Sequence, residues 1–394
     1  MKSSRISSMG FSKIQEQFRQ NIWRRSRSEG MLAHVDVSFT MFERFCQESY
    51  KKRSLGVIAK LKLDIQKAYR EGTGNKKLYL FLDNFVQWLS EYTPKKKANL
   101  SPITIRSYLS EIIQFLRYNE ILIDNDLLKH FVSLPKTLKE LPQPITRDEI
   151  NILVSNADEK RSALYLTLVS SGIRIGESLQ LRKRNFEMKS DPAKIFLPAQ
   201  ITKTRQARYS FISKEAKLKL IPILAKLEDD DLVFTDSNGV RRAELTEETY
   251  FTRLRKKVGL TEMESSGLKH KITLHKFRKF FATRAERKLG VQVSGALLGH
   301  NPYMKTYYEY EPSQLAKLYS DLESELTILP EHRQKLIIEN QEKEISDLKR
   351  SELEIQRLKS QQVDDKKQVL DMISKLVDDP EKFKEILKKS KSEN

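Results

Sequence analysis

The sequence has very little cysteine and lacks any long run of uncharged apolar residues. Cys46 is the single cysteine among 394 residues, which excludes an intramolecular disulfide and a zinc site built from several cysteines. Its setting in MFERFCQESY, on one face of an expected helix, indicates a buried structural thiol in a reducing, intracellular compartment. Since no segment could span a membrane and the basic first 30 residues lack the apolar stretch of a secretory signal, we expect no membrane partner.

Positive charge, by contrast, is abundant. The chain has 72 Lys and Arg against 53 Asp and Glu, which gives a formal net charge of +19. Such an excess favours a polyanion as the partner. A chain of 394 residues is also too long for one ordinary core, so two or three domains are expected.

The first part of the chain predicts helices. Residues 1–70 contain basic, helix-like sequence without a clear motif, and we expect a basic N-terminal arm or helical extension. Within residues 71–142, KKLYLFLDNFVQWLSEY and TIRSYLSEIIQFLRYNEI repeat apolar residues at three- and four-residue steps, which predicts a small all-helical domain. The prolines of SLPKTLKELPQPITRDE are typical of a linker and place the domain boundary near residue 143.

Residues 143–330 predict a second domain that is mainly α with a small antiparallel β-sheet. Thr146 and Glu149 form a capping box that opens its first helix, and Gly172 ends the next helix. AKIFLPAQITKTRQARYSFIS alternates around polar turn residues, which indicates a β-hairpin or three short strands. Helical sequence resumes from residue 214 to about residue 320.

Residues 331–394 differ in character, because EHRQKLIIENQEKEISDLKRSELEIQRLKSQQ is dense in charge and free of Gly and Pro. Apolar residues occupy a/d-like positions with two polar interruptions: Ile338, Ile345, Leu348 and Ile355, interrupted by Gln341 and Glu352. This pattern predicts a coiled-coil-like or long solvated helix. QVLDMISKLVDDPEKFKEILKKS then predicts a small amphipathic hairpin or a frayed tail. We hypothesise that this part mediates self-association or recruits a partner.

Cationic side chains that could hold a phosphate are spread over the second domain. They are Arg174 in SGIRIGE, Lys203 in the expected hairpin turn, His275 and Arg278 in HKFR, and His300 in LLGH. Each alone has an ordinary explanation as a solvated or capping side chain. Together they supply the cations and the proton donor that metal-free phosphodiester cleavage requires. No acidic cluster suited to two-metal chemistry lies beside them in the sequence, which argues against a metal-dependent nuclease.

The same chemistry needs a nucleophile that can stay attached to phosphate, and tyrosine can serve. The stretch ALLGHNPYMKTYYEYEP offers three candidates, Tyr307, Tyr308 and Tyr310.

In order and spacing these residues resemble the tyrosine recombinase (phage integrase) family, whose motifs are T-G-x-R-x-x-E, H-x-x-R, L-G-H and a downstream tyrosine. The resemblance covers residues of about 75–320, because the helical domain is similar to the family's core-binding domain. The helical tail lies outside the minimal family pattern. An archaeal or bacterial mobile element is compatible with these features.

The resemblance implies a role for each motif residue: Arg174 and Arg278 clamp the scissile phosphate, Lys203 protonates the leaving 5′-oxygen, His275 assists proton transfer at the tyrosine, His300 hydrogen-bonds the phosphate, and Glu177 orients Arg174. The family forms a 3′-phosphotyrosyl link that conserves the energy of the phosphodiester. The resemblance therefore implies that neither metal, ATP nor another cofactor is required.

The spacing of the nucleophile departs from the family pattern. The family places it nine residues after the L-G-H histidine, and that position holds Glu309. Counted back from Leu315 and Leu318, the apolar residues expected on the nucleophile's helix, Tyr307 is favoured. A shortened loop costs less than a slipped helix, which would turn buried leucines outward. Tyr310 could pack on the same face, and both other tyrosines remain alternatives.

The resemblance implies an enzyme that cleaves and rejoins double-stranded DNA at specific sites, acting as a homotetramer on paired sites in the cytoplasm, near the nucleoid. A catalytically inactive DNA-binding architectural protein is one alternative, and a type IB topoisomerase-like enzyme is another. The intact cationic set argues against the first. The helical domain and the separate L-G-H box favour a recombinase over the second.

Overall fold

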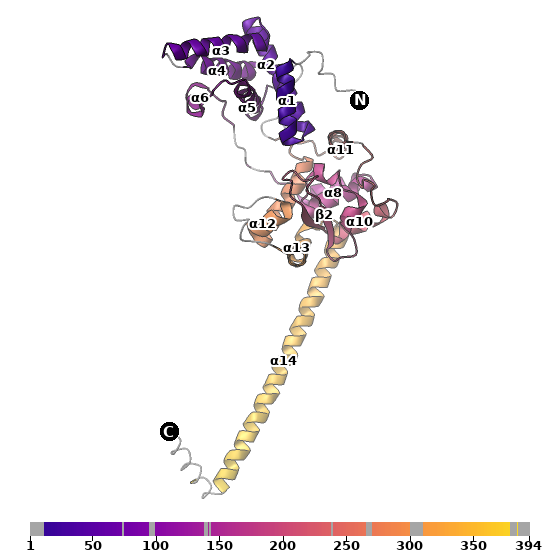
Figure 1. Cartoon of the computed structure of the whole chain (residues 1–394). Coiled ribbons are helices and arrows are strands. Elements are labelled where there is room, and N and C mark those ends of the chain that lie inside the picture. Colours follow the sequence, from indigo (N-terminus) through magenta and orange to yellow (C-terminus); the bar gives the residue numbers. More distant parts are fainter. Residues whose placement is uncertain are drawn as a thin grey trace.

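The computed structural model describes most of the chain, over residues 12–72, 75–93, 99–137, 141, 143–237, 239–264, 270–299, 310–378 and 384. Within these ranges the protein is mainly helical, with one three-stranded antiparallel sheet. This confirms the predicted fold class. Figure 1 shows a helical unit at the N-terminal side, a second unit that contains the sheet, and a long helix that leaves the second unit.

The first unit is helical throughout. Its helices are α1 (Lys13–Ser26), α2 (Glu29–Tyr50), α3 (Ser54–Arg70), α4 (Lys76–Glu91), α5 (Pro102–Tyr118) and α6 (Asn125–Phe131). Ser12, Ser28, Ser101 and Asp124 cap the starts of α1, α2, α5 and α6 by accepting hydrogen bonds from backbone N–H groups of the first turn.

The core of this unit draws on helices α1 to α5 and on the residues that follow them up to Val132. Phe18 of α1 and Phe42 of α2 are buried together with Phe85 of α4 and Phe115 of α5. The rings of Phe42 and Phe85 meet edge to face, with their centroids 5.4 Å apart. Residues 13–70, which we expected as an arm or extension, therefore share one core with the helices that follow them.

Cys46 lies inside this core and is fully buried. Burial raises the pKa of its thiol well above the ordinary range, so the reactive thiolate is not populated at neutral pH. The sequence interpretation of a buried structural thiol is confirmed.

The second unit is mixed. Its elements are α7 (Arg147–Asn156), α8 (Glu159–Ser171), α9 (Ile175–Ser178), the 3-10 helix η1 (Lys183–Asn185), β1 (Phe186–Glu187), β2 (Ala193–Leu197), β3 (Arg208–Ile212), α10 (Lys214–Leu224), α11 (Val240–Lys257), α12 (Leu274–Leu298) and α13 (Pro312–Leu326). The strand order is β1-β2-β3, with Ile195 opposite Ser210 in the β2–β3 pair. Both halves of the predicted capping box between Thr146 and Glu149 are present.

Helix α8 runs through the centre of this unit, and every residue from Ser162 to Ser171 is buried. It packs against α10, α12 and β3. Helix α13 joins the same core through Tyr319, whose hydroxyl donates a hydrogen bond of 2.8 Å to the Ser170 carbonyl. The central helix therefore fixes the positions of the elements that carry the candidate site.

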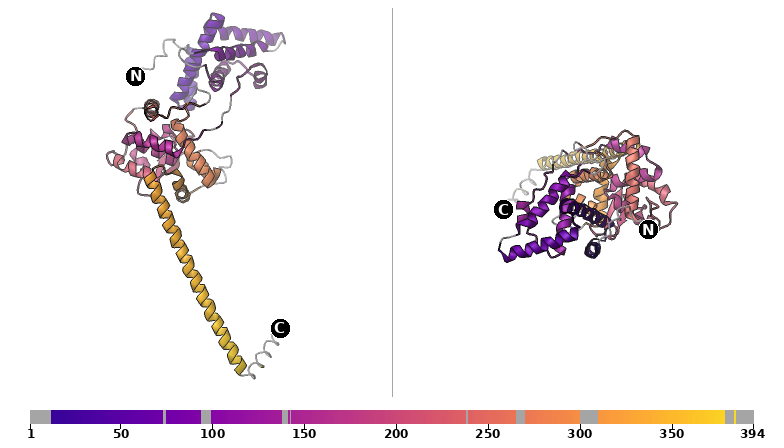
Figure 2. Two further views of the ribbon diagram at one scale, coloured as in Figure 1. Left: turned by 180° about the vertical axis from the view of Figure 1, so that it is seen from behind. Right: turned by 90° about the horizontal axis from the view of Figure 1, so that it is seen from above.

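Each of the two units has its own hydrophobic core. The first core ends at Val132 and the second begins at Ile145, on either side of the boundary expected near residue 143. Among the described residues, a hydrogen bond of 3.0 Å from Arg205 Nη2 to the Ser26 carbonyl links the two units. Figure 2 shows the two units from behind and from above.

The last element is α14 (Pro330–Asp378), a single helix of 49 residues that projects away from the second unit (Figures 1 and 2). It is continuous through residue 378, so the hairpin that we expected in this region does not turn before that point. Among the helices that the structure describes, none has both the length and the apolarity to cross a membrane.

Candidate active site

The site begins where α8 ends. Gly172 adopts a left-handed conformation, with φ of 63°, and an added Cβ would collide with the ring of Phe281. The turn leads to Arg174, the N-cap of α9, whose Nη1 donates a 2.9 Å hydrogen bond to Glu177 Oε1. The backbone N–H of Arg174 donates to the other carboxylate oxygen at 3.1 Å. The motif spacing of three residues thus holds this arginine against a carboxylate.

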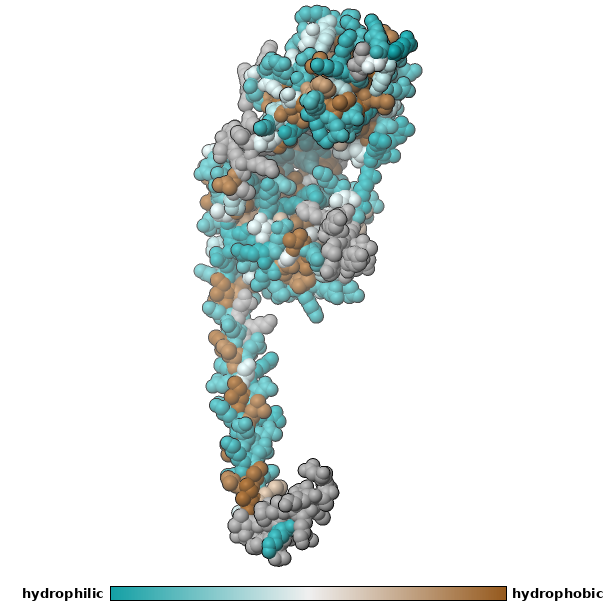
Figure 3. Space-filling view, turned by 90° about the vertical axis from the view of Figure 1, so that its left-hand side faces the viewer, coloured by the Kyte–Doolittle hydropathy of each residue, from teal (hydrophilic) through white to brown (hydrophobic). Residues whose placement is uncertain are grey.

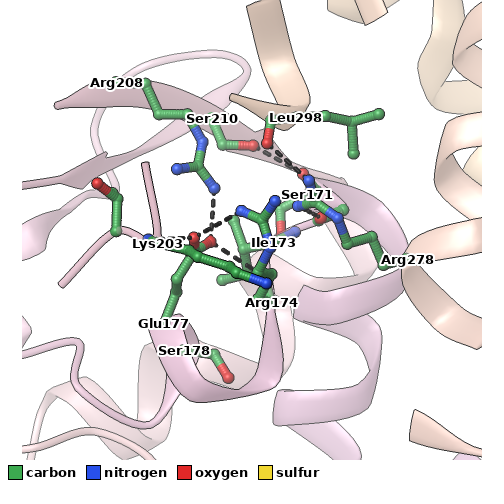
Figure 4. Close-up of polar contacts among 12 residues, drawn as sticks. Ser171, Ile173, Arg174, Glu177, Ser178, Lys203, Arg208, Ser210, Arg278 and Leu298 are labelled. Atoms are coloured by element: carbon green, nitrogen blue, oxygen red, sulfur yellow. Dashed lines mark hydrogen bonds and ion pairs between the residues drawn. The ribbon is translucent and has the colours of Figure 1, made fainter. Parts of the chain in front are cut away.

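Glu177 is the centre of the polar network in Figure 4. Its Oε2 also accepts a 2.6 Å hydrogen bond from Arg208 Nη2, and its Oε1 lies 3.5 Å from the donating backbone N–H of Lys203. Burial alone raises the pKa of Glu177, but the charge of Arg208 and the hydrogen bonds from both arginines outweigh it. The pKa therefore lies below its ordinary range, and the carboxylate is ionised at neutral pH.

Arg278 approaches from α12 and is only 5% exposed. It donates hydrogen bonds to the carbonyls of Gly172 and Leu298, the latter from Nη2 at 2.7 Å. The Gly172 carbonyl lies two residues before Arg174, and the Leu298 carbonyl lies two residues before His300 in the sequence. Arg278 therefore links the backbone that leads to each of these two motif residues. Burial and the nearby charge of Arg174 lower the pKa of Arg278 to about 10, which still leaves it charged at pH 7.

His275 lies one turn before Arg278 on α12 and is exposed. Partial desolvation and the positive charges of Lys279, Arg278 and Arg174 lower its pKa below the ordinary value. The imidazole is therefore mainly neutral near pH 7, and a neutral imidazole can accept a proton.

Lys203 lies in the turn between β2 and β3 and is exposed. Figure 4 shows it beside Glu177. Because its backbone is placed against the buried carboxylate while its side chain faces solvent, the turn can present an ammonium group next to the arginines. Arg174, Glu177, Lys203 and Arg278 are thus brought together.

His300, Tyr307 and Tyr308 lie outside the described residues. On the downstream side, Tyr310 is half-buried and packs against the core of the second unit. Leu315 is buried in that core and Leu318 packs against it, so both leucines face inward as the comparison with the family assumed. The identity of the nucleophile stays a prediction.

Sequence reasoning missed Arg208. Its side chain is 8% exposed, and its Nε and Nη1 have no hydrogen-bond partner among the described residues. A Cβ on Gly299 would lie 2.8–2.9 Å from this side chain, so Arg208 packs directly under the residue before His300. Strand alternation could have indicated it, because Arg208 and Ser210 face the same side and Ser210 Oγ bonds the Ser171 carbonyl.

The cluster has an excess of positive charge. Arg174, Arg208 and Arg278 each contribute a positive charge, and Glu177, which pairs with the first two, contributes one negative charge. Such an arrangement, largely removed from water, is suited to an anion with two negative charges. Within the described ranges, no group of three or more His, Cys, Asp or Glu side chains is arranged to hold a metal ion.

The phage integrase family matches residues 143–314. The tyrosine recombinase XerA of Pyrococcus horikoshii is 27% identical over 213 residues, which cover 52% of this chain and 68% of that protein. The tyrosine recombinase XerC of Rickettsia bellii is 24% identical over 234 residues, covering 56% of this chain and 71% of that protein.

The solved structures that this chain matches include two recombinases. The crystal structure of XerA recombinase gives a TM-score of 0.34 at 19% identity, covering 73% of this chain and 98% of that chain. The XerH recombinase bound to its difH substrate gives 0.44 at 17% identity, covering 78% and 94%. The family match includes every predicted motif residue from Arg174 to Tyr310. Residues 143–314 therefore form a domain of the phage integrase family, the tyrosine recombinases.

Proposed function

We propose that the protein is a site-specific DNA recombinase that cleaves and rejoins DNA strands through a covalent 3′-phosphotyrosyl intermediate. The observation that carries the proposal is the cluster of Arg174, Arg208 and Arg278 around Glu177, at the junction of α8, α9, β3 and α12. Its excess positive charge matches the transition state of phosphoryl transfer, and it lies within a phage integrase domain.

Two arginines would act on the scissile phosphate. Arg174 keeps 24% of its side chain exposed, so its guanidinium can reach a phosphate at the surface while Glu177 fixes its direction. Arg278 is nearly buried and held by two carbonyls, so its charge is already in place before the substrate binds. Preorganised charge of this kind stabilises the transition state without a reorganisation cost.

The proton transfers use the remaining residues. The tyrosine oxygen forms a bond to phosphorus and gives its proton to neutral His275. The bond from phosphorus to the 5′-oxygen breaks, and Lys203 donates a proton to that oxygen from the β2–β3 turn. His300 would hydrogen-bond a phosphate oxygen. We propose Tyr307 as the nucleophile, with Tyr308 and Tyr310 as alternatives.

Double-stranded DNA is the proposed partner, because the chain has a net charge of +19. Recombination joins two duplexes and needs a protomer for each of four strands, so we propose a homotetramer on paired sites. Such a protein would work in the cytoplasm, at the nucleoid. No metal, ATP or other cofactor enters the proposed reaction.

The test is a covalent adduct on DNA that the protein selects itself. Duplexes bound by the full-length protein are selected from a random library, and the selected sequence is rebuilt with a nick beside the cleavage position. We expect an adduct that survives denaturation, and we expect its loss in Arg174→Ala and in the Phe variant of the nucleophilic tyrosine.

Other outcomes would favour the alternatives. Tight, specific binding without any adduct would indicate an architectural DNA-binding protein. Relaxation of supercoiled DNA that lacks the selected sequence would indicate a type IB topoisomerase-like enzyme. Retention of the adduct in Tyr307→Phe would move the nucleophile to one of the neighbouring tyrosines.

A further inference from the structure

Helix α14 exposes apolar side chains along most of its length. Ile338, Ile345, Leu348, Val363 and Ile373 are all at least 51% exposed. In Figure 3 hydrophobic residues recur along the projecting helix, separated by hydrophilic ones. A single helix of 49 residues gains little from packing when such side chains stay in water, so its surface indicates a missing partner.

Seven of the exposed apolar side chains, together with four polar ones, form one continuous line along the helix, which we call the stripe. Its positions are Ile338, Gln341, Ile345, Leu348, Glu352, Ile355, Lys359, Val363, Lys366, Leu370 and Ile373. The ten steps from Ile338 to Ile373 are of three or four residues and cover 35 residues, an average of 3.5. This is the repeat of a left-handed coiled coil, so the expected partner is another helix.

The charge of α14 indicates which kind of partner could cover the stripe. Residues 330–378 contain ten Lys and Arg against eleven Asp and Glu, in a chain whose net charge is +19. A helix with balanced charge has no general attraction for DNA or for an anionic membrane. A helix with the same pattern of apolar and oppositely charged positions is the better match.

We propose that α14 pairs with α14 of a second copy of this chain, in antiparallel orientation. In one register the stripe matches its own reverse almost position for position. Ile338 then faces the partner's Ile373, and Leu348 faces the partner's Val363. Gln341 faces the partner's Leu370, and the aliphatic stem of the partner's Lys366 covers Ile345.

Charge decides the orientation. In the antiparallel register Glu352 faces the partner's Lys359, and the symmetry of the dimer repeats this pair. In a parallel, in-register dimer Glu352, Lys359 and Lys366 would each face the same residue of the partner. Three like-charge contacts inside the seam would oppose parallel pairing, whereas the antiparallel arrangement turns two of them into opposite-charge pairs.

The register also fixes the distance between the second units of the two copies. Residue 338 of one copy aligns with residue 373 of the other, and eight residues of α14 separate residue 338 from Pro330 in each copy, so the second units lie about 75 Å apart along the rod. This contact therefore joins two protomers without covering either active site. The inference does not depend on the proposed recombinase activity.

Disulfide trapping in the full-length protein tests the orientation. Because the native Cys46 is fully buried, it should not form a disulfide, and any cross-link that appears can be assigned to the introduced cysteine. Gln341→Cys alone and Leu370→Cys alone should each give no cross-linked dimer on oxidation, whereas their equimolar mixture should give one. Cross-linking within each single variant would show a parallel dimer and overturn the proposal.

Sedimentation of the protein without DNA tests whether the stripe is the surface through which two copies associate. Leu348 lies on the stripe and is 64% exposed, and Leu353 lies off the stripe and is 66% exposed, so the two form a matched pair. We expect the wild type and Leu353→Glu to be dimers and Leu348→Glu to dissociate with a Kd at least tenfold higher, with unchanged helicity by circular dichroism. A monomeric wild type, or equal effects of both variants, would overturn the proposal.

A charge exchange gives a second check of register. Glu352→Lys should weaken the dimer, because it places two lysines opposite each other, and adding Lys359→Glu should restore it. Failure of the second change to restore association contradicts the antiparallel register even if the chain dimerises.

Discussion

Arg208 donates a hydrogen bond of 2.6 Å to the carboxylate of Glu177, across 31 residues of sequence. The same carboxylate holds Arg174, so the two arginines share one negative charge. If Arg208 did not take part of that charge, Glu177 would neutralise Arg174 more completely. Arg208 thus keeps Arg174 available for an anion and adds its own positive charge to the site.

Replacing Arg208 should therefore slow cleavage more than it weakens DNA binding. For Arg208→Ala we expect a loss of roughly 100-fold in the rate of adduct formation, the usual cost of removing one preorganised donor. Arg208→Lys should recover part of the rate, since it keeps the charge without the fork. Arg184→Ala, which removes an exposed arginine on η1, serves as control and should leave the rate unchanged.

A modified substrate separates an electrostatic role of Arg208 from a purely structural one. A methylphosphonate at the cleavage position carries one negative charge less than a phosphodiester. The loss caused by Arg208→Ala should be smaller on this duplex, because its transition state needs less positive charge. Equal losses on both duplexes would mean that Arg208 only supports the fold.

Gly299 should be sensitive to substitution because it packs on Arg208. Its φ is 65°, and an added Cβ would lie 2.8–2.9 Å from the arginine side chain. Gly259, just after the end of α11, is a matched control, with φ of 77° and no atom within 4 Å of the added Cβ. Both Ala variants should lose about 1 kcal/mol of stability from backbone strain, but only Gly299→Ala should also slow adduct formation. Equal rates in the two variants would contradict the predicted contact.

Removing the charge of Glu177 should destabilise the second unit. The carboxylate is buried between two arginines, and Glu177→Gln would leave them without compensation. We expect a loss of about 3 kcal/mol, or roughly 6–12 °C in Tm. Glu187→Gln, at a half-exposed ion pair with Lys194, should change stability by less than about 0.5 kcal/mol.

Added sulfate gives a further check on the same variant. The uncompensated arginines of Glu177→Gln should bind an anion more strongly than the wild-type site does. Sulfate should therefore raise the Tm of Glu177→Gln more than that of the wild type or of Glu187→Gln. A Tm of Glu177→Gln equal to that of the wild type without sulfate would show that the carboxylate is not essential for holding the arginines.

Local features of the fold were predictable from sequence because their causes are local. Ser101 before Pro102 and the Thr146–Glu149 capping box fix helix starts through contacts within three residues. The contact of Arg174 with Glu177 was predictable for the same reason. The hairpin of β2 and β3 followed from alternation around polar turn residues, whereas β1 lies upstream of the segment that predicted strands.

Features that depend on tertiary contacts could not be read in the same way. The pairing of β2 with β3 is what brings Arg208 to Glu177, and no motif spacing encodes that approach. The shared core of α1 to α5 was missed because residues 13–70 have a helical pattern but no sign of which face meets a partner. For the tail, the sequence predicted a coiled-coil-like or long solvated helix, and the structure shows one helix from Pro330 through residue 378.

The pH dependence of cleavage should report His275. A base acts in its neutral form, so the rate should rise with pH through the pKa of His275 and level off above it. Because desolvation and the charges of Lys279, Arg278 and Arg174 lower this pKa, the rate should rise at a lower pH than an unperturbed histidine would give. Lys279→Gln removes one of these charges and should move the rising limb to higher pH, whereas Lys288→Gln, further along α12, should not. In His275→Ala the rise of the cleavage rate with pH should disappear. A rise that persists in this variant would show that another group titrates.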